Sequence, residues 1–167
     1  VVLSPISSAF YAMNYKDLLL LPGLSISCNG PVLSVILASH CPMAELTAQK
    51  VIFSRESASA ASFMKMIFLR KNIEPDYEIG PIKDCRQLAR ASAGVLAIGD
   101  VALTEPWSQS FEYVYDLGQI WYEMTQLPFV FAVWAVRKDF ARAFPQRVCD
   151  IHQRLLDSMA AGYAQIR

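Results

Sequence analysis

The feature that most constrains this chain is a series of short apolar runs separated by polar or helix-forming segments. The clearest runs cover residues 32–39, 50–53, 94–98 and 128–137. They are rich in β-branched and aliphatic residues, and none reaches the roughly 20 apolar residues that a membrane-spanning helix needs. Runs of this length are typical of buried strands. The sequence therefore predicts an α/β protein.

Helical segments follow several of these strands. Apolar spacing predicts short helices over residues 9–13, 84–90 and 118–125 and a long amphipathic helix over 145–166. A further helix follows Ser59, and its apolar face is expected to carry these four residues: Phe63, Met66, Ile67 and Leu69. Because strands and helices alternate, we expect a parallel sheet.

Two long apolar stretches, residues 24–39 and 128–136, enclose an α/β segment. We therefore predict three parts: residues 1–40 as the first part of an outer lobe with its hinge, 41–127 as an inserted α/β lobe, and 128–167 as a returning hinge strand and C-terminal helix. Two lobes joined by two crossing strands are the architecture of a hinge-closing binding protein, with the ligand in the cleft. One continuous doubly wound sheet is the alternative.

Composition excludes several function classes. Fifteen basic residues balance fifteen acidic ones, so the chain lacks the positive surface that nucleic-acid or anionic-membrane binding requires. Any bound anion must therefore be captured locally. The opening residues do not form a secretory signal, which predicts a cytoplasmic location.

Cysteines and histidines give little support for a metal or a disulfide framework. Cys28, Cys41, Cys85 and Cys149 are scattered, so reduced thiols are expected. Two histidines leave little material for a His-based triad, and the common nucleotide-binding, serine-hydrolase and metalloprotease motifs are absent from the sequence. The remaining possibility is a cofactor-free site of hydroxyls, amides and a carboxylate.

Two predicted junctions between a strand and a helix could bind an anion. Glu56, Ser57, Ala58 and Ser59 follow one strand, and Ser7 and Ser8 follow another. Free amides of a helix N-terminus and neighbouring hydroxyls suit a carboxylate, and two such cradles facing each other would suit a dicarboxylate. Ordinary helix capping by these serines is the alternative at both junctions.

Other polar candidates lie near the predicted hinge and at strand ends. Ser27, Asn29 and Gly30 form a polar cluster, although Gly30 could simply supply a turn with positive φ. Asp100 ends a buried strand, where ligands of open α/β sheets gather, or it caps the next turn. Asp116 could be only a helix start.

Several blocks resemble the MqnA branch of the MqnA/MqnD family of menaquinone biosynthesis. The two longest are residues 98–103 (IGDVAL) and 116–134 (DLGQIWYEMTQLPFVFAVW). Further similar positions are Ser7, Ser8, Leu18 to Leu21, Ser25 to Ser27, Gly30 to Val32 and Glu56 to Ser59. Together these blocks follow the family's order through nearly the whole chain.

The resemblance implies a periplasmic-binding-protein type II fold and a lyase that dehydrates chorismate to 3-[(1-carboxyvinyl)oxy]benzoate in the futalosine pathway. It implies a small dicarboxylate substrate and neither a metal nor an organic cofactor. It assigns carboxylate contacts to these residues: Ser27, Ser57, Ala58 and Ser59, with Ser7 and Ser8 contributing from the outer lobe. Asp100 becomes the catalytic candidate. The sister branch, which cleaves cyclic dehypoxanthine futalosine, has a catalytic His followed by an acid where this chain has Gly99 and Asp100.

The chain departs from the family pattern at three places. Gln126 replaces a usual Gly, Ser54 and Arg55 replace Thr-Pro, and Cys28 replaces Ser. The resemblance also implies a family N-terminal strand with a ligand-orienting Asn ahead of Val1, and hence an incomplete and inactive chain. A solute-binding module that closes on a small carboxylate without chemistry is the alternative from another functional class, because fold does not fix activity.

Overall fold

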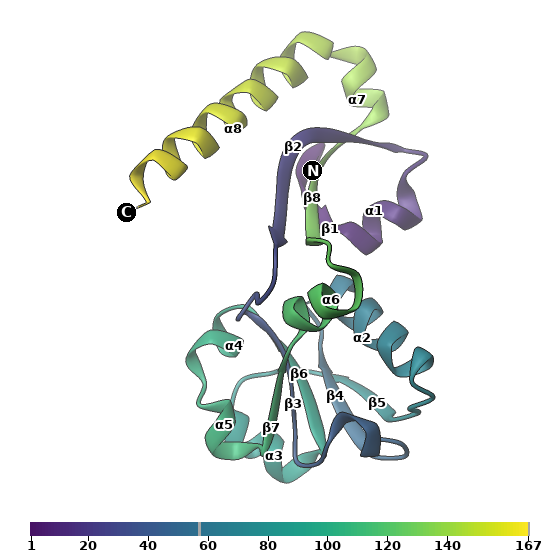
Figure 1. Ribbon diagram of the computed structural model, residues 1–167. Helices are drawn as coiled ribbons and strands as arrows, with labels where there is room; N and C mark the ends of the chain where they lie inside the picture. The colour runs from purple at the N-terminus through teal and green to yellow at the C-terminus, as the bar shows by residue number, and fades with distance from the viewer. Residues whose placement is uncertain (57, 167) are drawn as a thin grey trace. The chain divides into compact units, whose positions relative to one another are not determined.

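The structure is a computed structural model that describes residues 1–56 and 58–166. The chain divides into two compact units: Val1–Ser27 with Val130–Arg167, and Cys28–Phe129. Figure 1 labels the helices and strands of both. The predicted first part, residues 1–40, included strand β3 (Val35–Ser39), but β3 pairs with strands of the second unit.

The second unit is built on a mixed sheet with the strand order β5-β4-β6-β3-β7. Besides β3, its strands are β4 (Lys50–Ser54), β5 (Asp76–Gly80), β6 (Gly94–Ile98) and β7 (Tyr113–Asp116). Strand β4 is parallel to β5 and β6, whereas β3 is antiparallel to β6 and β7. The prediction of a parallel sheet is therefore wrong for β3. A loop leads into β3, whereas a parallel strand needs a crossover connection, usually a helix.

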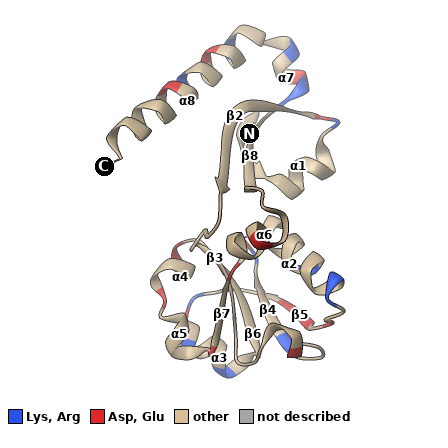
Figure 2. Cartoon of the chain, viewed as in Figure 1, with Lys and Arg blue, Asp and Glu red and all other residues tan. Residues whose placement is uncertain are grey.

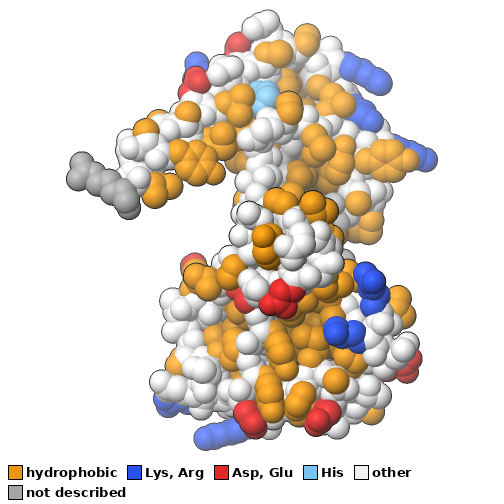
Figure 3. Space-filling view, viewed as in Figure 1, with side chains coloured by type: hydrophobic (Ala, Val, Ile, Leu, Met, Phe, Trp, Pro, Cys, Tyr) orange, Lys and Arg blue, Asp and Glu red, His pale blue; other side chains and the backbone are white. Residues whose placement is uncertain are grey.

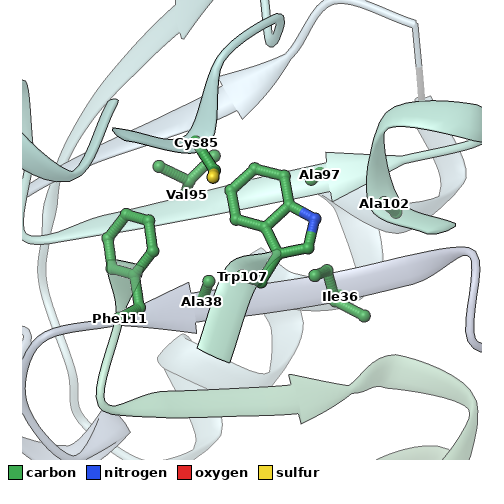
Figure 4. Close-up of a cluster of buried hydrophobic side chains, with 8 residues drawn as sticks. All are labelled: Ile36, Ala38, Cys85, Val95, Ala97, Ala102, Trp107 and Phe111. Atoms are coloured by element: carbon green, nitrogen blue, oxygen red, sulfur yellow. The ribbon is translucent and has the colours of Figure 1, made fainter. Parts of the chain in front are cut away.

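Helices cover both faces of this sheet, and one face holds a compact apolar cluster (Figure 4). Strands β3 and β6 contribute to it together with α3 (Cys85–Ala91), α4 (Asp100–Thr104) and α5 (Trp107–Ser110). The buried members are Ile36, Ala38, Cys85, Val95, Ala97, Ala102, Trp107 and Phe111. Trp107 is at the centre of this cluster, and its Nε1 donates a hydrogen bond of 3.1 Å to the Val101 carbonyl.

Helices α2 (Ala58–Arg70) and α6 (Leu117–Thr125) cover the opposite face. Phe68 of α2 packs against Tyr77, which contacts Phe53 of β4. The prediction that Leu69 lies on the apolar face is wrong, because this residue is 78% exposed. The buried stripe of α2 instead follows the positions i, i+1, i+4 and i+5: Phe63, Met64, Ile67 and Phe68.

The first unit has a sheet with the order β1-β8-β2, formed by β1 (Leu3–Ser7), β8 (Phe129–Arg137) and β2 (Leu18–Cys28). Helix α1 (Ser8–Asn14) follows β1, and α7 (Lys138–Ala143) and α8 (Pro145–Gln165) follow β8. The core combines three buried residues, Leu21, Leu24 and Val136, with side chains of α7 and α8.

Strand β2 continues through Pro22 and Gly23 without ending. Leu21 and Leu24 are both buried in the same cluster, although an odd spacing in a regular strand would place them on opposite faces. Gly23 has φ +76°. A glycine in this conformation allows a bulge, which returns Leu24 to the core face.

Pro5 lies in the middle of β1, where its missing N–H costs no bond to β8. The Arg137 amide donates to the Val2 carbonyl at 2.9 Å, so Val2 and Arg137 form a hydrogen-bonded pair of the antiparallel ladder. Hydrogen-bonded and non-hydrogen-bonded pairs alternate, which makes Pro5 and Trp134 a non-hydrogen-bonded pair. The nitrogen of Pro5 therefore faces the free edge, as expected for proline in an edge strand.

Helix α6 ends at Gln126, which adopts the left-handed conformation with φ 58° and ψ 24°. Its amide donates to the Tyr122 carbonyl at 2.8 Å, and its Nε2 donates to the same carbonyl at 3.0 Å. The turn before Pro128 thus forms with glutamine at a position that favours glycine. Within residues 1–56 and 58–166, no helix combines the length and apolar character needed to cross a membrane.

Replacing Gln126 by glycine should raise the free energy of unfolding by up to about 1 kcal/mol. A left-handed residue with a Cβ costs about 1–2 kcal/mol, and the greater freedom of glycine in the unfolded chain offsets part of this gain. Urea unfolding of the two proteins measures the difference. The matched Gln126→Ala variant keeps the left-handed cost and should not be stabilised; equal stabilisation by both variants would contradict the explanation.

Candidate functional site

The candidate site lies at one edge of the sheet in the second unit, which we call the carboxyl edge. Strands β4, β5, β6 and β7 end there, and the antiparallel strand β3 begins there, as the pairs Val35 with Ile98 and Ile36 with Asp116 show. Helices α2, α4 and α6 follow these strand ends directly (Figure 1). In α/β sheets, ligands bind at such edges.

The junction between β4 and α2 carries the predicted carboxylate cradle. The Ser54 hydroxyl accepts a hydrogen bond of 3.2 Å from the Glu56 amide, which turns the chain out of the strand. Glu56 and Ala58 are exposed, whereas Ser59 is only 5% exposed. Ser57 lies outside the described residues. Ala58 and Ser59 lie in the first turn of α2, which is the position that the predicted carboxylate cradle requires.

Arg55 adds a cation to this junction. Its side chain is exposed and forms no ion pair with any described residue. A guanidinium offers paired donors that match a carboxylate. Sequence reasoning noted Arg55 only as a departure from the family pattern, although the electroneutral chain already required a local charge for binding anions.

The junction between β6 and α4 carries Asp100. Gly99 precedes the helix with φ +67°, and its amide donates to the Ser34 carbonyl at 2.8 Å. Asp100 is the first residue within α4, and Gly99 occupies the cap position, so the capping alternative for Asp100 is wrong. The Asp100 carboxylate is exposed and has no hydrogen bond or ion pair in the described part of the chain. It is therefore available to a ligand.

Asp116, at the junction between β7 and α6, binds two segments at once. Its Oδ1 accepts from the Gln119 amide at 3.0 Å and so caps α6. The same carboxylate accepts from the Val32 amide, at 3.0 Å from both oxygens, and from the Leu33 amide at 2.6 Å. Residues 28–34 run from the last residue of β2 to the residue before β3, and we call them the 28–34 loop. The bonds of Asp116 fix this loop against the start of α6. This also explains why the strand predicted from Val32 begins only at Val35.

The 28–34 loop approaches α6 closely at two glycines. Gly30 has φ +98°, as its predicted turn required. A Cβ on Gly118 would lie 2.5 Å from the Gly30 carbonyl oxygen and 2.7 Å from the Cys28 Sγ, closer than real atoms pack. Asn29 is exposed beside buried Gly30. The structure therefore brings Asn29 and Gly30 to the carboxyl edge.

The Cys28 thiol is held in its protonated form. Burial, and next the negative charge of Asp116, raise the pKa of this thiol above its usual value. Since only a thiolate is an effective nucleophile, Cys28 acts here as a packing residue against Gly118.

The remaining predicted contacts belong to the first unit. Ser7 is the N-cap of α1 and accepts from the Phe10 amide at 3.1 Å, so the capping alternative holds for Ser7. Ser8 is the first residue of that helix. Ser27 is exposed, and its hydroxyl lies 3.1 Å from that of Ser25.

Among the described residues, no metal-binding cluster marks the carboxyl edge. The described residues include no group of three or more His, Cys, Asp or Glu that could hold a metal ion. Basic and acidic residues are spread along the chain in Figure 2, and they are equal in number. A cavity of about 410 Å³ lies elsewhere, between Met43, Lys71 and Met124. Figure 3 shows hydrophobic side chains on this same unit near α6.

Asp116 is a residue whose contacts with the 28–34 loop could not be predicted from the sequence. The block that begins with Asp116, Leu117 and Gly118 indicated a helix start, and the cap is present. Its bonds to Val32 and Leu33 join residues more than eighty positions apart. Only the tertiary structure brings these amides to the carboxylate.

Known proteins resemble the chain in sequence. A curated chorismate dehydratase from Thermus thermophilus is 33% identical over an alignment of 154 residues that covers 83% of this chain and 55% of that protein. The chain thus spans about half the length of this relative.

Solved structures resemble its fold. Protein AF1704 of Archaeoglobus fulgidus matches 97% of this chain and 56% of its own chain, with a TM-score of 0.63 and 16% identity. The periplasmic aliphatic sulphonate binding protein SsuA of Escherichia coli matches 97% of this chain and 55% of its own, with a TM-score of 0.50 and 18% identity. The predicted periplasmic-binding-protein-like α/β fold is confirmed.

A family model described as menaquinone biosynthesis matches residues 1–167. This match covers the whole sequence and agrees with the curated relative. The chain therefore belongs to the menaquinone biosynthesis family.

Proposed function

We propose that this chain forms part of a lyase that dehydrates chorismate to 3-[(1-carboxyvinyl)oxy]benzoate in the futalosine route to menaquinone. The 33% identity to a chorismate dehydratase is the observation that carries the proposal. The family match over residues 1–167 supports the same pathway. The exposed acid and the cation at the carboxyl edge provide chemistry that suits this reaction.

The reaction removes the C3 proton and the C4 hydroxyl of chorismate as one water molecule. The pair of electrons from the C3–H bond enters the ring, which becomes aromatic as hydroxide leaves with a proton. Aromatisation drives the step, so the protein must mainly hold two carboxylates, orient the ring and supply a proton acceptor. In this proposal, no metal or organic cofactor takes part.

Each group at the carboxyl edge has a proposed role. Ala58 and Ser59 at the start of α2, together with Ser57, bind one carboxylate through amides and hydroxyls, and Arg55 adds its charge. Asn29 and Gly30 contact the substrate from the 28–34 loop. Asp100 accepts or directs the proton, because its carboxylate is exposed and not engaged by the described residues. Ser7, Ser8 and Ser27 are proposed as further contacts supplied by the first unit.

A carboxylate-binding module without chemistry is the second candidate. The likeness to SsuA over 97% of the chain favours it at the level of fold alone. The sister reaction on cyclic dehypoxanthine futalosine is less favoured, because Gly99 replaces the catalytic histidine implied for that branch.

Incubation of the protein with chorismate should abolish the diene absorbance and give one equivalent of the enol-ether benzoate. Absorbance and product chromatography measure this conversion. Chorismate binding without a spectral change would support the binding module instead, and turnover of cyclic dehypoxanthine futalosine alone would support the sister enzyme.

The Asp100→Asn variant should lower the dehydration rate by about a hundredfold or more, the usual contribution of a positioned acid–base group, with little change in stability. Asp76→Asn is the matched control, since Asp76 is exposed at the start of β5, on the opposite edge of the sheet. An unchanged rate in Asp100→Asn would remove the catalytic assignment.

The Arg55→Gln variant should weaken chorismate binding about three- to tenfold, a moderate loss because water screens an exposed ion pair. Arg70→Gln provides the matched control: Arg70 is likewise exposed but lies in the last turn of α2, at the opposite end from Arg55. Titration calorimetry measures both affinities. Equal losses in the two variants would mean that only net charge matters.

A further inference from the structure

We propose that Asp116 is a positioning residue of the carboxyl edge: it fixes the 28–34 loop and thereby places Asn29 and Gly30 for binding. This inference rests on the proposed function, which makes Asn29 and Gly30 substrate contacts. Asp116 itself reaches no substrate atom in this proposal, because its oxygens are engaged by backbone amides.

The first argument comes from the number and kind of its bonds. One cap bond to Gln119 suffices to start α6, and serine, threonine or asparagine would provide it equally well. The second oxygen is used for the Leu33 amide at 2.6 Å, and both oxygens are 3.0 Å from the Val32 amide. Only a carboxylate can accept all of these bonds, so the side chain has a second task beyond capping.

The second argument comes from the backbone that Asp116 holds. Leu33 has φ +63°, a left-handed conformation that is unfavourable for a bulky residue. Its side chain is 65% exposed, so packing does not compensate for this cost. Two hydrogen bonds hold this conformation: the Ser34 amide donates to the Val32 carbonyl at 2.7 Å, and the Leu33 amide donates to Asp116 at 2.6 Å. Backbone strain maintained in this way is typical of functional sites.

The third argument comes from the path between Asp116 and the predicted contacts. Val32 follows Asn29 and Gly30 after a single proline, whose ring restricts the backbone. Gly30 is itself packed against Gly118, two residues beyond Asp116. Gln119 Oε1 lies 4.0 Å from the point where a Gly30 Cβ would be. A shift of the Val32 amide would therefore be transmitted directly to Gly30.

The Asp116→Ser variant separates the two tasks. Serine remains a good helix cap for Gln119, but its single short hydroxyl cannot also accept from Val32 and Leu33. We expect amide hydrogen exchange at Val32 and Leu33 to accelerate about tenfold or more, because each amide loses a hydrogen bond to a charged acceptor. We expect chorismate binding to weaken about tenfold at temperatures where the variant is fully folded.

Asp84→Ser is the matched control. Asp84 caps α3 in the same unit, and its carboxylate accepts from the nearby amides of Arg86 and Gln87 and from no other described residue. Its substitution should lower stability to a similar extent and leave both the exchange of Val32 and Leu33 and the chorismate affinity unchanged. A purely structural role of Asp116 would leave the chorismate affinity the same in both variants.

The outcomes are distinguishable. Unchanged exchange at Val32 and Leu33 in Asp116→Ser would overturn the proposal, as would accelerated exchange with unchanged chorismate affinity. Failure of the unaltered protein to bind chorismate would count against the proposed function, and hydrogen exchange alone would then decide whether Asp116 fixes the loop.

Discussion

A single carboxylate organises the carboxyl edge of the second unit. Asp116 accepts hydrogen bonds from the amides of Val32, Leu33 and Gln119, and so joins the loop before β3 to the start of α6. Amides that bind an ionised oxygen form stronger bonds than neutral pairs. These bonds replace the strand pairing that Val32 and Leu33 would otherwise need. The left-handed Leu33 and the close packing of Gly30 on Gly118 lie on either side of this bonded segment.

Around this fixed point, the edge combines features that suit a small anion. The start of α2 supplies amides and a nearby arginine, and the start of α4 supplies an exposed carboxylate. The opposing charges of Arg55 and Asp100 would have different tasks in the proposed reaction, one in binding and one in proton transfer. In the proposed function, a charge-neutral chain of the menaquinone biosynthesis family would bind its anion through these local groups, without a basic surface.

Local sequence signals were sufficient for much of the fold. The buried strand β6 and the bounds of α8 follow from apolar periodicity, and the positive φ of Gly30 follows from its turn. Periodicity failed where tertiary contacts decided the outcome. Leu69 continues an apolar pattern but lies outside the buried stripe of α2, and β2 continues through Pro22 and Gly23, a pair of residues typical of turns.

The site shows the same division between local and distant information. Asp100 is predicted as a site residue from its place after a strand, because ligands bind at strand ends in α/β sheets. The double task of Asp116 could not be identified, since its partners at Val32 and Leu33 are distant in sequence and carry no polar side chain. A backbone amide leaves no trace in the identity of its residue.

The direction of β3 determines at which edge of the sheet the 28–34 loop lies. Strand β3 has five residues, a length of about 17 Å at the usual rise per residue. If β3 were parallel to its neighbours, the 28–34 loop would reach the sheet at the edge opposite the carboxyl edge. The loop would then lie about 17 Å from the starts of α2, α4 and α6. Reversal of one short strand therefore delivers an extra backbone segment to the rim where three helices already begin, without any increase in the size of the unit.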